Sequence, residues 1–303
     1  MELFSKTPSY DFLGKQKWFL IGSGLLVVLS LFIWIKLGPA KYGVDFSGGH
    51  ELVVEMGEGV SSEEIRNALD GGGISDATVQ AFEASTHQFA FRFQSEQSST
   101  KVKEQVVSLF KEKFGDKFKQ IVKTDYVGPA VGAELQTKGI LAVSLGVIGI
   151  LLYIAFRFEF AFGFGAVVAV FHDVIVSTGI YLATGHTISM STLAAALTIL
   201  GYSVNDTIVI FDRVRDELEK SREGTLTDIV NRSINITLSR TLITQVLTTF
   251  SVAALMVLGS GAISELSVFL FAGMITGCYS TIYIASPLMI WWHHFRGGTD
   301  QIA

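Results

Sequence analysis

Six long runs of apolar residues constrain this chain more than any other feature of its sequence. An α-helix rises about 1.5 Å per residue, so roughly 20 residues cross the ~30 Å hydrocarbon core of a bilayer. Of the 303 residues, 49% are apolar and only 17% are charged, which is unusual for a soluble domain of this length. The sequence therefore predicts a polytopic α-helical membrane protein with six transmembrane helices, at residues 18–37, 138–157, 160–183, 189–211, 241–258 and 266–292.

The first run, 18–37, has two interpretations. Lys15 and Lys17 precede it, as basic residues precede the apolar core of a secretory signal peptide. The residues that follow it, 36–40, lack a small-x-small cleavage site, and the run is long enough to span a membrane. We interpret it as a retained anchor.

The distribution of Lys and Arg predicts the orientation, because short loops rich in these residues stay on the cytoplasmic side. The short loops 184–188 and 259–265 contain none. Basic residues lie before the first run and between or after later ones: Lys6, Lys15, Lys17, Arg157, six residues from Arg213 to Arg240, and Arg296. We therefore expect both termini in the cytoplasm. The predicted parts are a cytoplasmic N-terminus (1–17), an extracytoplasmic domain (38–137) and a five-helix membrane domain (138–303) with a cytoplasmic loop (212–240).

Segment 38–137 has the pattern of a small α+β domain rather than of membrane helices. Ser61 is followed by Glu64 at the spacing of a capping box, which predicts the start of a helix. Period-2 and helical patterns predict strands at 50–56, 77–82, 88–93 and 118–127, with helices at 61–70 and 98–114. The order βαββαβ is that of a ferredoxin-like domain. Without clustered His or Cys, we expect it to bind or move rather than to catalyse.

Familiar catalytic and cofactor patterns are absent from the sequence. It contains no GxxxxGK[ST] phosphate loop, no HExxH, no GxSxG and no CxxC. A single cysteine, Cys278, cannot form an internal disulfide, and no cluster of ligands suits a metal. No basic stripe of the kind that binds nucleic acid is present. We therefore expect a protein that is not an enzyme and has no cofactor, metal or nucleic-acid partner, and whose energy comes from an ion gradient or from a partner.

Charged residues inside the apolar runs are the strongest indication of function, because an Asp or Arg at a helix centre costs about 2.5–3.5 kcal/mol on insertion scales. Asp206, next to Asn205, lies roughly 8 Å inside the cytoplasmic edge of its run at the helical rise. Arg240 begins the following run at about the same level. If the two pair, burial and opposite charge act against each other on the carboxyl group, as in a proton relay. A static structural ion pair is the alternative.

His172 and Asp173 form a second polar pair, deep in the third run. At the helical rise they lie roughly 18–20 Å from the cytoplasmic start of their helix. They are candidates for a second relay step, because an imidazole exchanges protons near neutral pH. Buried hydrogen-bonding structure without a proton role is an equal alternative.

Several longer motifs carry a family resemblance. The run GVDFSGG at 43–49 resembles the G-x-D-F-x-G-G motif of the SecD/SecF family of protein-export membrane proteins. Further blocks resemble the SecF branch in order and spacing: LLYIAFRFEFAFGFGAVVAVFHDV at 151–174, GYSVNDTIVIFDRVRD at 201–216, NRSINITLSRTLITQ at 231–245 and GCYSTIYIASP at 277–287. One departure is Gln245, where the family is expected to have Ser or another small residue.

The resemblance implies a subunit of the bacterial cytoplasmic (inner) membrane, related to resistance-nodulation-division transporters. Members of the family act with SecD beside the SecYEG channel, with YajC as a further candidate partner. They use the proton-motive force to promote translocation of unfolded polypeptides, which the periplasmic domain would contact. The family's intramembrane Asp and Arg fall on Asp206 and Arg240.

The motif after the first run is the predicted joint between membrane and domain. Asp45, Phe46, Gly48 and Gly49 belong to it, and its glycines permit backbone conformations that a hinge needs. A simple turn before the first strand is the alternative. Two other functions stay open: a scaffold that moves no proton, and an exporter of small apolar molecules, which predicts twelve spans and two large loops in one chain.

Overall fold

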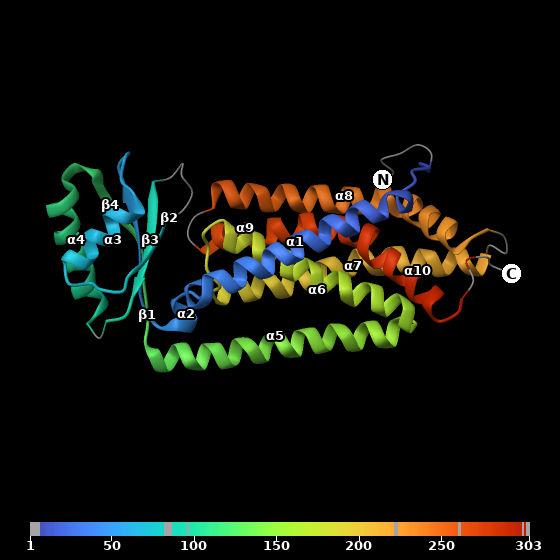
Figure 1. Ribbon diagram of the computed structural model, residues 1–303, viewed down its shortest axis with the longest axis horizontal. Coiled ribbons are helices and arrows are strands. Elements are labelled where there is room, and N and C mark those ends of the chain that lie inside the picture. Colours follow the sequence, from blue (N-terminus) through green and yellow to red (C-terminus); the bar gives the residue numbers. More distant parts are fainter. Residues whose placement is uncertain are drawn as a thin grey trace. The chain divides into compact units, whose positions relative to one another are not determined.

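The computed structural model describes residues 7–81, 87–95, 97–220, 224–259, 262–298 and 300, and Figure 1 traces its helices and strands in chain order. The elements are η1 (Leu13–Lys15), α1 (Gln16–Leu37), η2 (Gly38–Lys41), α2 (Val44–Ser47), β1 (Gly49–Met56), α3 (Ser62–Gly71), β2 (Thr78–Ala81), β3 (Gln88–Phe93), α4 (Ser99–Phe114), η3 (Gly115–Lys117), β4 (Phe118–Val127), α5 (Pro129–Arg157), α6 (Phe160–Ala183), α7 (Met190–Lys220), α8 (Leu226–Leu258), α9 (Ala262–Ser280), η4 (Thr281–Ala285) and α10 (Ser286–Phe295). Several predicted features lie outside the described residues: the strand end at Phe82, the basic residues Lys6 and Arg222, and residues 260 and 261 of the short loop 259–265.

Six helical stretches among the described residues are long and apolar enough to cross a membrane. They are Leu13–Lys41, Pro129–Arg157, Phe160–Ala183, Met190–Lys220, Leu226–Leu258 and Ala262–Phe295, of which the last consists of α9, η4 and α10. A helix suits this environment because it satisfies its own backbone N–H and C=O groups where no water is available. The predicted polytopic helical architecture with six apolar helices is confirmed.

The segment 212–240, predicted as a loop, is helical over most of its length. α7 continues to Lys220, and α8 already begins at Leu226. Thr225 and Asp228 form a capping box that starts α8, which satisfies backbone N–H groups at its first turn. The helices extend past their apolar parts because paired charges stabilise helical turns in water.

The helix α5 also begins earlier than predicted, at Pro129 instead of 138. Proline suits a first helical position, since its missing N–H would have no partner there. One turn further on, Glu134 and Lys138 form an i,i+4 ion pair at 2.7 Å. Most of this charged turn precedes the apolar run, which begins at Lys138, so hydropathy alone does not detect it.

The chain divides into two compact units, and the α+β domain belongs to the one made of Trp34–Ala142 and Tyr181–Leu193. Its sheet has the strand order β2-β3-β1-β4, with every neighbouring pair antiparallel. The helices α3 and α4 connect β1 to β2 and β3 to β4, and both lie on one side of the sheet (Figure 1). Their shared core contains the fully buried Leu52, Ile65, Phe91, Val106 and Phe110. The predicted capping box at Ser61 and Glu64 is present.

The other unit contains Met1–Ile33, Val143–Ile180 and Ala194–Ala303. Small residues let its helices approach one another closely. A side chain at Gly273 of α9 would overlap Ile199 of α7, and a Cβ at Gly277 would lie 3.6 Å from the Asp173 carboxylate of α6. Close approach of α9 therefore brings the polar groups of three helices within hydrogen-bonding distance.

His186 is a buried polar residue in the connection between α6 and α7. Its ring stacks on Tyr181 with centroids 4.7 Å apart, and its Nδ1 lies 2.9 Å from the Thr184 hydroxyl. Burial lowers the pKa of His186 from its ordinary 6.5 to about 4, because the charged imidazolium would lose its hydration.

We predict that this histidine makes folding stability fall as the pH drops from 6.5 toward 4. In the unfolded chain His186 binds a proton near pH 6.5, whereas in the folded chain it binds one only near pH 4. Acid therefore lowers the free energy of unfolding by roughly 3 kcal/mol. Thermal unfolding in detergent should show this loss in the parent protein and a flatter profile in His186→Gln. Equal slopes in the two proteins would contradict the assignment.

Candidate functional site

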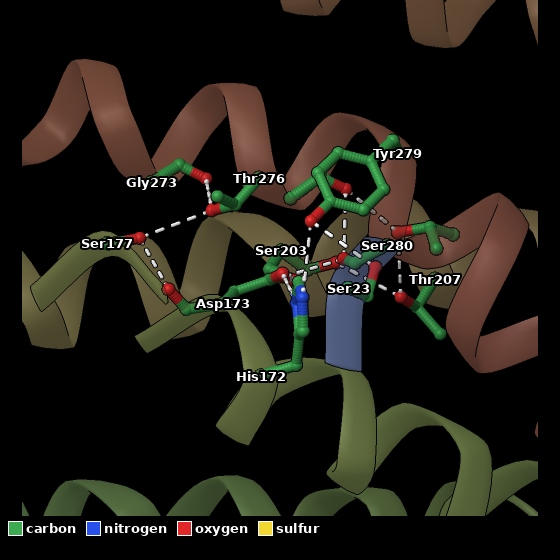
Figure 2. A network of polar contacts seen from close by, with 12 residues as sticks. Ser23, His172, Asp173, Ser177, Ser203, Thr207, Gly273, Thr276, Tyr279 and Ser280 are labelled. Carbon is green, nitrogen blue, oxygen red and sulfur yellow. Dashed lines mark hydrogen bonds and ion pairs between the residues drawn. The ribbon is translucent and has the colours of Figure 1, made fainter. Parts of the chain in front are cut away.

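Asp173 of α6 is the centre of a buried hydrogen-bond network (Figure 2). The His172 Nδ1 lies 2.9 Å from its Oδ1. The Ser203 hydroxyl of α7 and the Ser280 hydroxyl of α9 donate to its Oδ2 at 2.6 and 2.7 Å. A fully buried carboxylate is tolerated only with such donors, because it has lost its hydration. Asp173 therefore joins α6, α7 and α9 at one point.

His172 extends this network toward α1. The Tyr279 hydroxyl of α9 lies 3.2 Å from His172 Nε2, and the Ser23 hydroxyl of α1 lies 3.5 Å from the Tyr279 hydroxyl. Both imidazole nitrogens thus have a polar partner, and an imidazole can hold a proton on either one. Ser23 and Tyr279 also line a groove of about 430 Å³, together with Trp18, Phe19, Gly22 and Leu26. The polar chain from Asp173 therefore ends at an open groove.

The turn after Ser280 is a π-helical segment, η4, and not a regular α-helical turn. Pro287 follows it, and proline has no N–H to offer to the carbonyl four residues earlier. The widened turn accommodates this, and the Ser286 hydroxyl donates to the Thr281 carbonyl at 3.0 Å. It also leaves the Thr281 hydroxyl 3.1 Å from that of Thr207 on α7. Widened helical turns occur frequently at functional sites.

Asp206 of α7 has a different environment from Asp173. Its side chain is 5% exposed, and the hydrogen bond that reaches its carboxylate comes from Gln245 of α8, whose Nε2 donates to Oδ2 at 2.5 Å. Gln245 is itself only 3% exposed, and its Oε1 is buried without a hydrogen-bond partner among the described residues. Asp206 is thus a buried carboxylate held by one neutral amide.

Arg240 does not contact Asp206. No ion pair within 4.0 Å joins the two among the described residues, although Arg240 lies near enough to act on the carboxylate through its charge. Arg240 is exposed on α8, and Asn205 is exposed on α7. The structure therefore brings Asp206 together with Gln245, and leaves Arg240 and Asn205 on the outer faces of their helices.

Helical spacing could have identified Gln245 as the partner of Asp206. Leu238, Thr241, Gln245 and Val252 recur at intervals of three, four and seven residues, and all are buried. Arg240 falls on the opposite side of this stripe. Comparing only the depth of Asp206 and Arg240 along their helices leaves out which face each side chain occupies.

The motif at 43–49 is densely bonded rather than an open turn. Residues Val44–Ser47 form the helical turn α2, and Gly48 and Gly49 follow with φ of +70° and +102°. A Cβ at Gly49 would lie 2.6 Å from the Phe93 carbonyl, so this position requires glycine. The Phe46 ring packs at 6.3 Å from that of Tyr42.

Asp45 connects this motif to the start of α7. Its Oδ2 accepts the backbone N–H of Met190 at 2.8 Å, which caps the first turn of that helix. Beside it, Gly43 donates to the Ile188 carbonyl at 2.9 Å, and Ile188 donates to that of Lys41 at 2.8 Å. The four predicted joint residues therefore lie at a bonded junction within one unit, and a hinge role for them stays a prediction.

The polar chemistry that these residues offer is proton binding. Two buried carboxylates and one imidazole lie in helices that are apolar enough to cross a membrane. Among the described residues, no group of three or more His, Cys, Asp or Glu side chains is placed to hold a metal ion. The two carboxylates differ in support, since Asp173 has three side-chain partners and Asp206 has one.

We predict that the two carboxylates respond differently to substitution. Asp173→Ala should lower stability by about 3 kcal/mol or more, because His172, Ser203 and Ser280 lose a buried partner. Asp206→Asn should change it by less than about 1 kcal/mol, because the new amide oxygen still accepts from Gln245. Thermal unfolding in detergent measures both. Equal losses of stability in the two variants would show that the number of hydrogen-bond partners does not distinguish the two carboxylates.

Comparison with known proteins adds to this geometry. The family described as "Protein export membrane protein SecD/SecF, C-terminal" matches residues 105–295. "Protein translocase subunit SecF" of Rickettsia rickettsii is 37% identical over 293 residues, which cover 95% of this chain and 94% of the relative. The protein of the same name from Calditerrivibrio nitroreducens is 37% identical over 297 residues, covering 95% and 96% of the two chains.

Solved structures show the same relationship. The crystal structure of SecDF from Thermus thermophilus superposes with a TM-score of 0.83 at 33% identity, over 96% of this chain and 40% of that one. A SecDF structure in a super-membrane-facing form gives 0.69 at 33% identity, over 97% and 40%. The chain thus spans about 40% of the SecDF chains that it matches. On its sequence motifs, its six apolar helices and these similarities, the chain belongs to the SecD/SecF family of protein export membrane proteins, among the SecF translocase subunits.

Proposed function

We propose that this SecF chain works with SecD as a proton-driven auxiliary of protein translocation through SecYEG. The observation that carries the proposal is Asp206, a carboxylate buried inside an apolar helix with one neutral amide as its partner. A buried ionisable group of this kind in a membrane helix usually marks an ion or proton path. The protein is then a transport subunit and not an enzyme, and it needs no cofactor beyond the proton gradient.

The proton gradient supplies enough energy for such a step. One elementary charge crossing 100 mV yields about 2.3 kcal/mol, which shifts a two-state equilibrium roughly fifty-fold. Protonation of Asp206 removes a buried negative charge between α7 and α8. The electrostatic attraction between Asp206 and the nearby Arg240 is then lost. We infer that this changes the packing of the two helices.

His172 and Asp173 are a second candidate relay step. The chain from Ser23 through Tyr279 and His172 to Asp173 is continuous, with steps of 3.5, 3.2 and 2.9 Å. A continuous chain of groups that donate and accept supports proton transfer between α1 and the centre of the unit. Its alternative is a buried hydrogen-bond network without a proton role.

A partner surface on α7 supports association with SecD. The exposed residues of α7 at helical spacing are small or polar: Ala194, Thr198, Gly201 and Asn205. The exposed residues of α5 include smaller ones such as Ala142 and Ser144 but also many large apolar side chains, as suits lipid: Ile140, Leu145, Ile148, Leu152 and Phe156. Small and polar residues favour contact with another helix rather than with hydrocarbon. A SecD half is a fitting occupant, because the matched SecDF chains contain much more than this chain.

We assign the small domain to the ferredoxin-like fold, on its βαββαβ order and its strand order β2-β3-β1-β4. The distribution of Lys and Arg supports a bacterial cytoplasmic membrane topology with both termini inside and this domain in the periplasm. There it would contact the unfolded polypeptide as it emerges, with YajC as a further candidate partner. Similarity to a SecF translocase subunit over 95% of this chain disfavours the small-molecule exporter.

We predict that Asp206→Asn abolishes the gradient-stimulated part of export while leaving assembly intact. Asparagine keeps the contact with Gln245 but cannot exchange a proton at this position. Export of a secreted reporter is measured in membrane vesicles with and without a proton gradient. Asp216→Asn, a substitution of an exposed carboxylate on the same helix, is the matched control. A full gradient response in Asp206→Asn would show that Asp206 is not the proton site, and the relay would then lie in His172–Asp173 or in the partner chain.

We predict that Gly201→Leu weakens co-purification of SecD at least about tenfold, which corresponds to roughly 1.4 kcal/mol. A Cβ at Gly201 meets no atom within 4 Å among the described residues. The leucine side chain would therefore obstruct a partner on this surface without disturbing the subunit's own packing. Gly149→Leu on α5 is the matched control, since it is equally open and faces the large apolar side chains. If both variants retain SecD equally, the partner does not lie on this face of α7.

A further inference from the structure

The environment of Asp206 contains one unexplained atom, the buried Oε1 of Gln245. It is an acceptor without a hydrogen-bond partner in the part of the chain that the structure describes, and Gln245 is only 3% exposed. Leaving a buried polar atom unpaired is destabilising, because the atom has lost its hydration without gaining a partner. The same amide already donates through Nε2 to Asp206 Oδ2 at 2.5 Å. The unpaired acceptor therefore belongs to a group that already contacts the carboxylate.

Other charged or titratable groups around Asp206 come from three helices. Arg240 of α8, Tyr202 of α7 and Cys278 of α9 all lie near enough to interact with its charge. The Tyr202 hydroxyl is 3.4 Å from the Thr244 carbonyl, and Arg240 forms no ion pair with Asp206 within the described residues. Gln245 is thus the group in hydrogen-bond contact with the carboxylate.

A carboxylic acid and a primary amide are complementary planar groups, because each has one donor and one acceptor on the same edge. An ionised Asp206 has no donor and can use only the N–H of Gln245. A protonated Asp206 gains an O–H, and the neighbouring unpaired acceptor is Gln245 Oε1. Protonation then supplies the donor that this buried atom lacks.

Resting on the proposed role of Asp206, we propose that Gln245 holds the transported proton through a two-point contact with the protonated carboxyl group. The O–H of Asp206 donates to Oε1 while Nε2 donates to the other carboxyl oxygen. The step is a proton transfer to the carboxylate, and no other bond is made or broken. It adds one hydrogen bond between α7 and α8, so the proton on Asp206 tightens these two helices. Gln245 is a positioning residue here, since the proton itself resides on Asp206.

Infrared difference spectroscopy of the purified protein in lipid vesicles, between acid and neutral pH, tests this. Asp206→Asn identifies the carboxyl C=O band of protonated Asp206 by its loss. In Gln245→Leu the same band should move to higher wavenumber, because both hydrogen bonds to the carboxyl group are gone. Thr241→Val is the matched control: its hydroxyl is also buried and unpaired on α8, and the band should stay in place. Gln245→Met, which keeps the length of the side chain, gives the same shift if the leucine variant does not fold.

The outcomes separate this inference from the proposed function. A band that is lost in Asp206→Asn but unmoved in Gln245→Leu and Gln245→Met overturns the two-point contact and leaves Asp206 as a proton site. A band that moves equally in Thr241→Val overturns the contact as well, since the shift is then not specific to the amide. If no acid-induced band depends on Asp206, both the proton role of Asp206 and the contact are overturned.

Discussion

The structure depends on one constraint: a polar group inside a membrane helix must find its partner within the protein. Lipid offers no hydrogen bonds, so each buried carboxylate selects which helices come together around it. The Asp173 carboxylate has hydrogen-bond partners in hydroxyl groups of α7 and α9 and in the adjacent His172 imidazole. The Asp206 carboxylate accepts one hydrogen bond, from the Gln245 amide of α8. The two sites thus show two solutions to the same problem, one with several donors and one with a single neutral partner.

The helix α7 carries residues of both buried carboxylate sites. It carries Ser203, which bonds to Asp173, and Asp206 one turn further on. Its first turn, at Met190, is capped by Asp45 from the motif that precedes β1. The capped residue Met190 and the buried Asp206 thus belong to one helix.

Much of this architecture follows from local sequence. Hydropathy is sufficient for the six apolar helices, because the length of an apolar run and the thickness of a bilayer are directly comparable. The capping box at Ser61 is equally local, since it needs only two residues three positions apart. Helix ends outside the hydrocarbon were predicted less well. The start of α5 and the extent of α7 depend on paired charges and caps that hydropathy does not weigh.

The sequence by itself determined that the chain is a membrane protein of the SecD/SecF family, with intramembrane charges at Asp206 and Arg240 and a polar pair at His172 and Asp173. Only the tertiary structure decided which of these groups meet. Asp206 contacts Gln245 and not Arg240, and Asp173 contacts Ser203 and Ser280 from helices far away in the chain. The physical reason is that depth along a helix follows from the 1.5 Å rise, whereas contact depends on the face each side chain occupies and on how the helices rotate against one another.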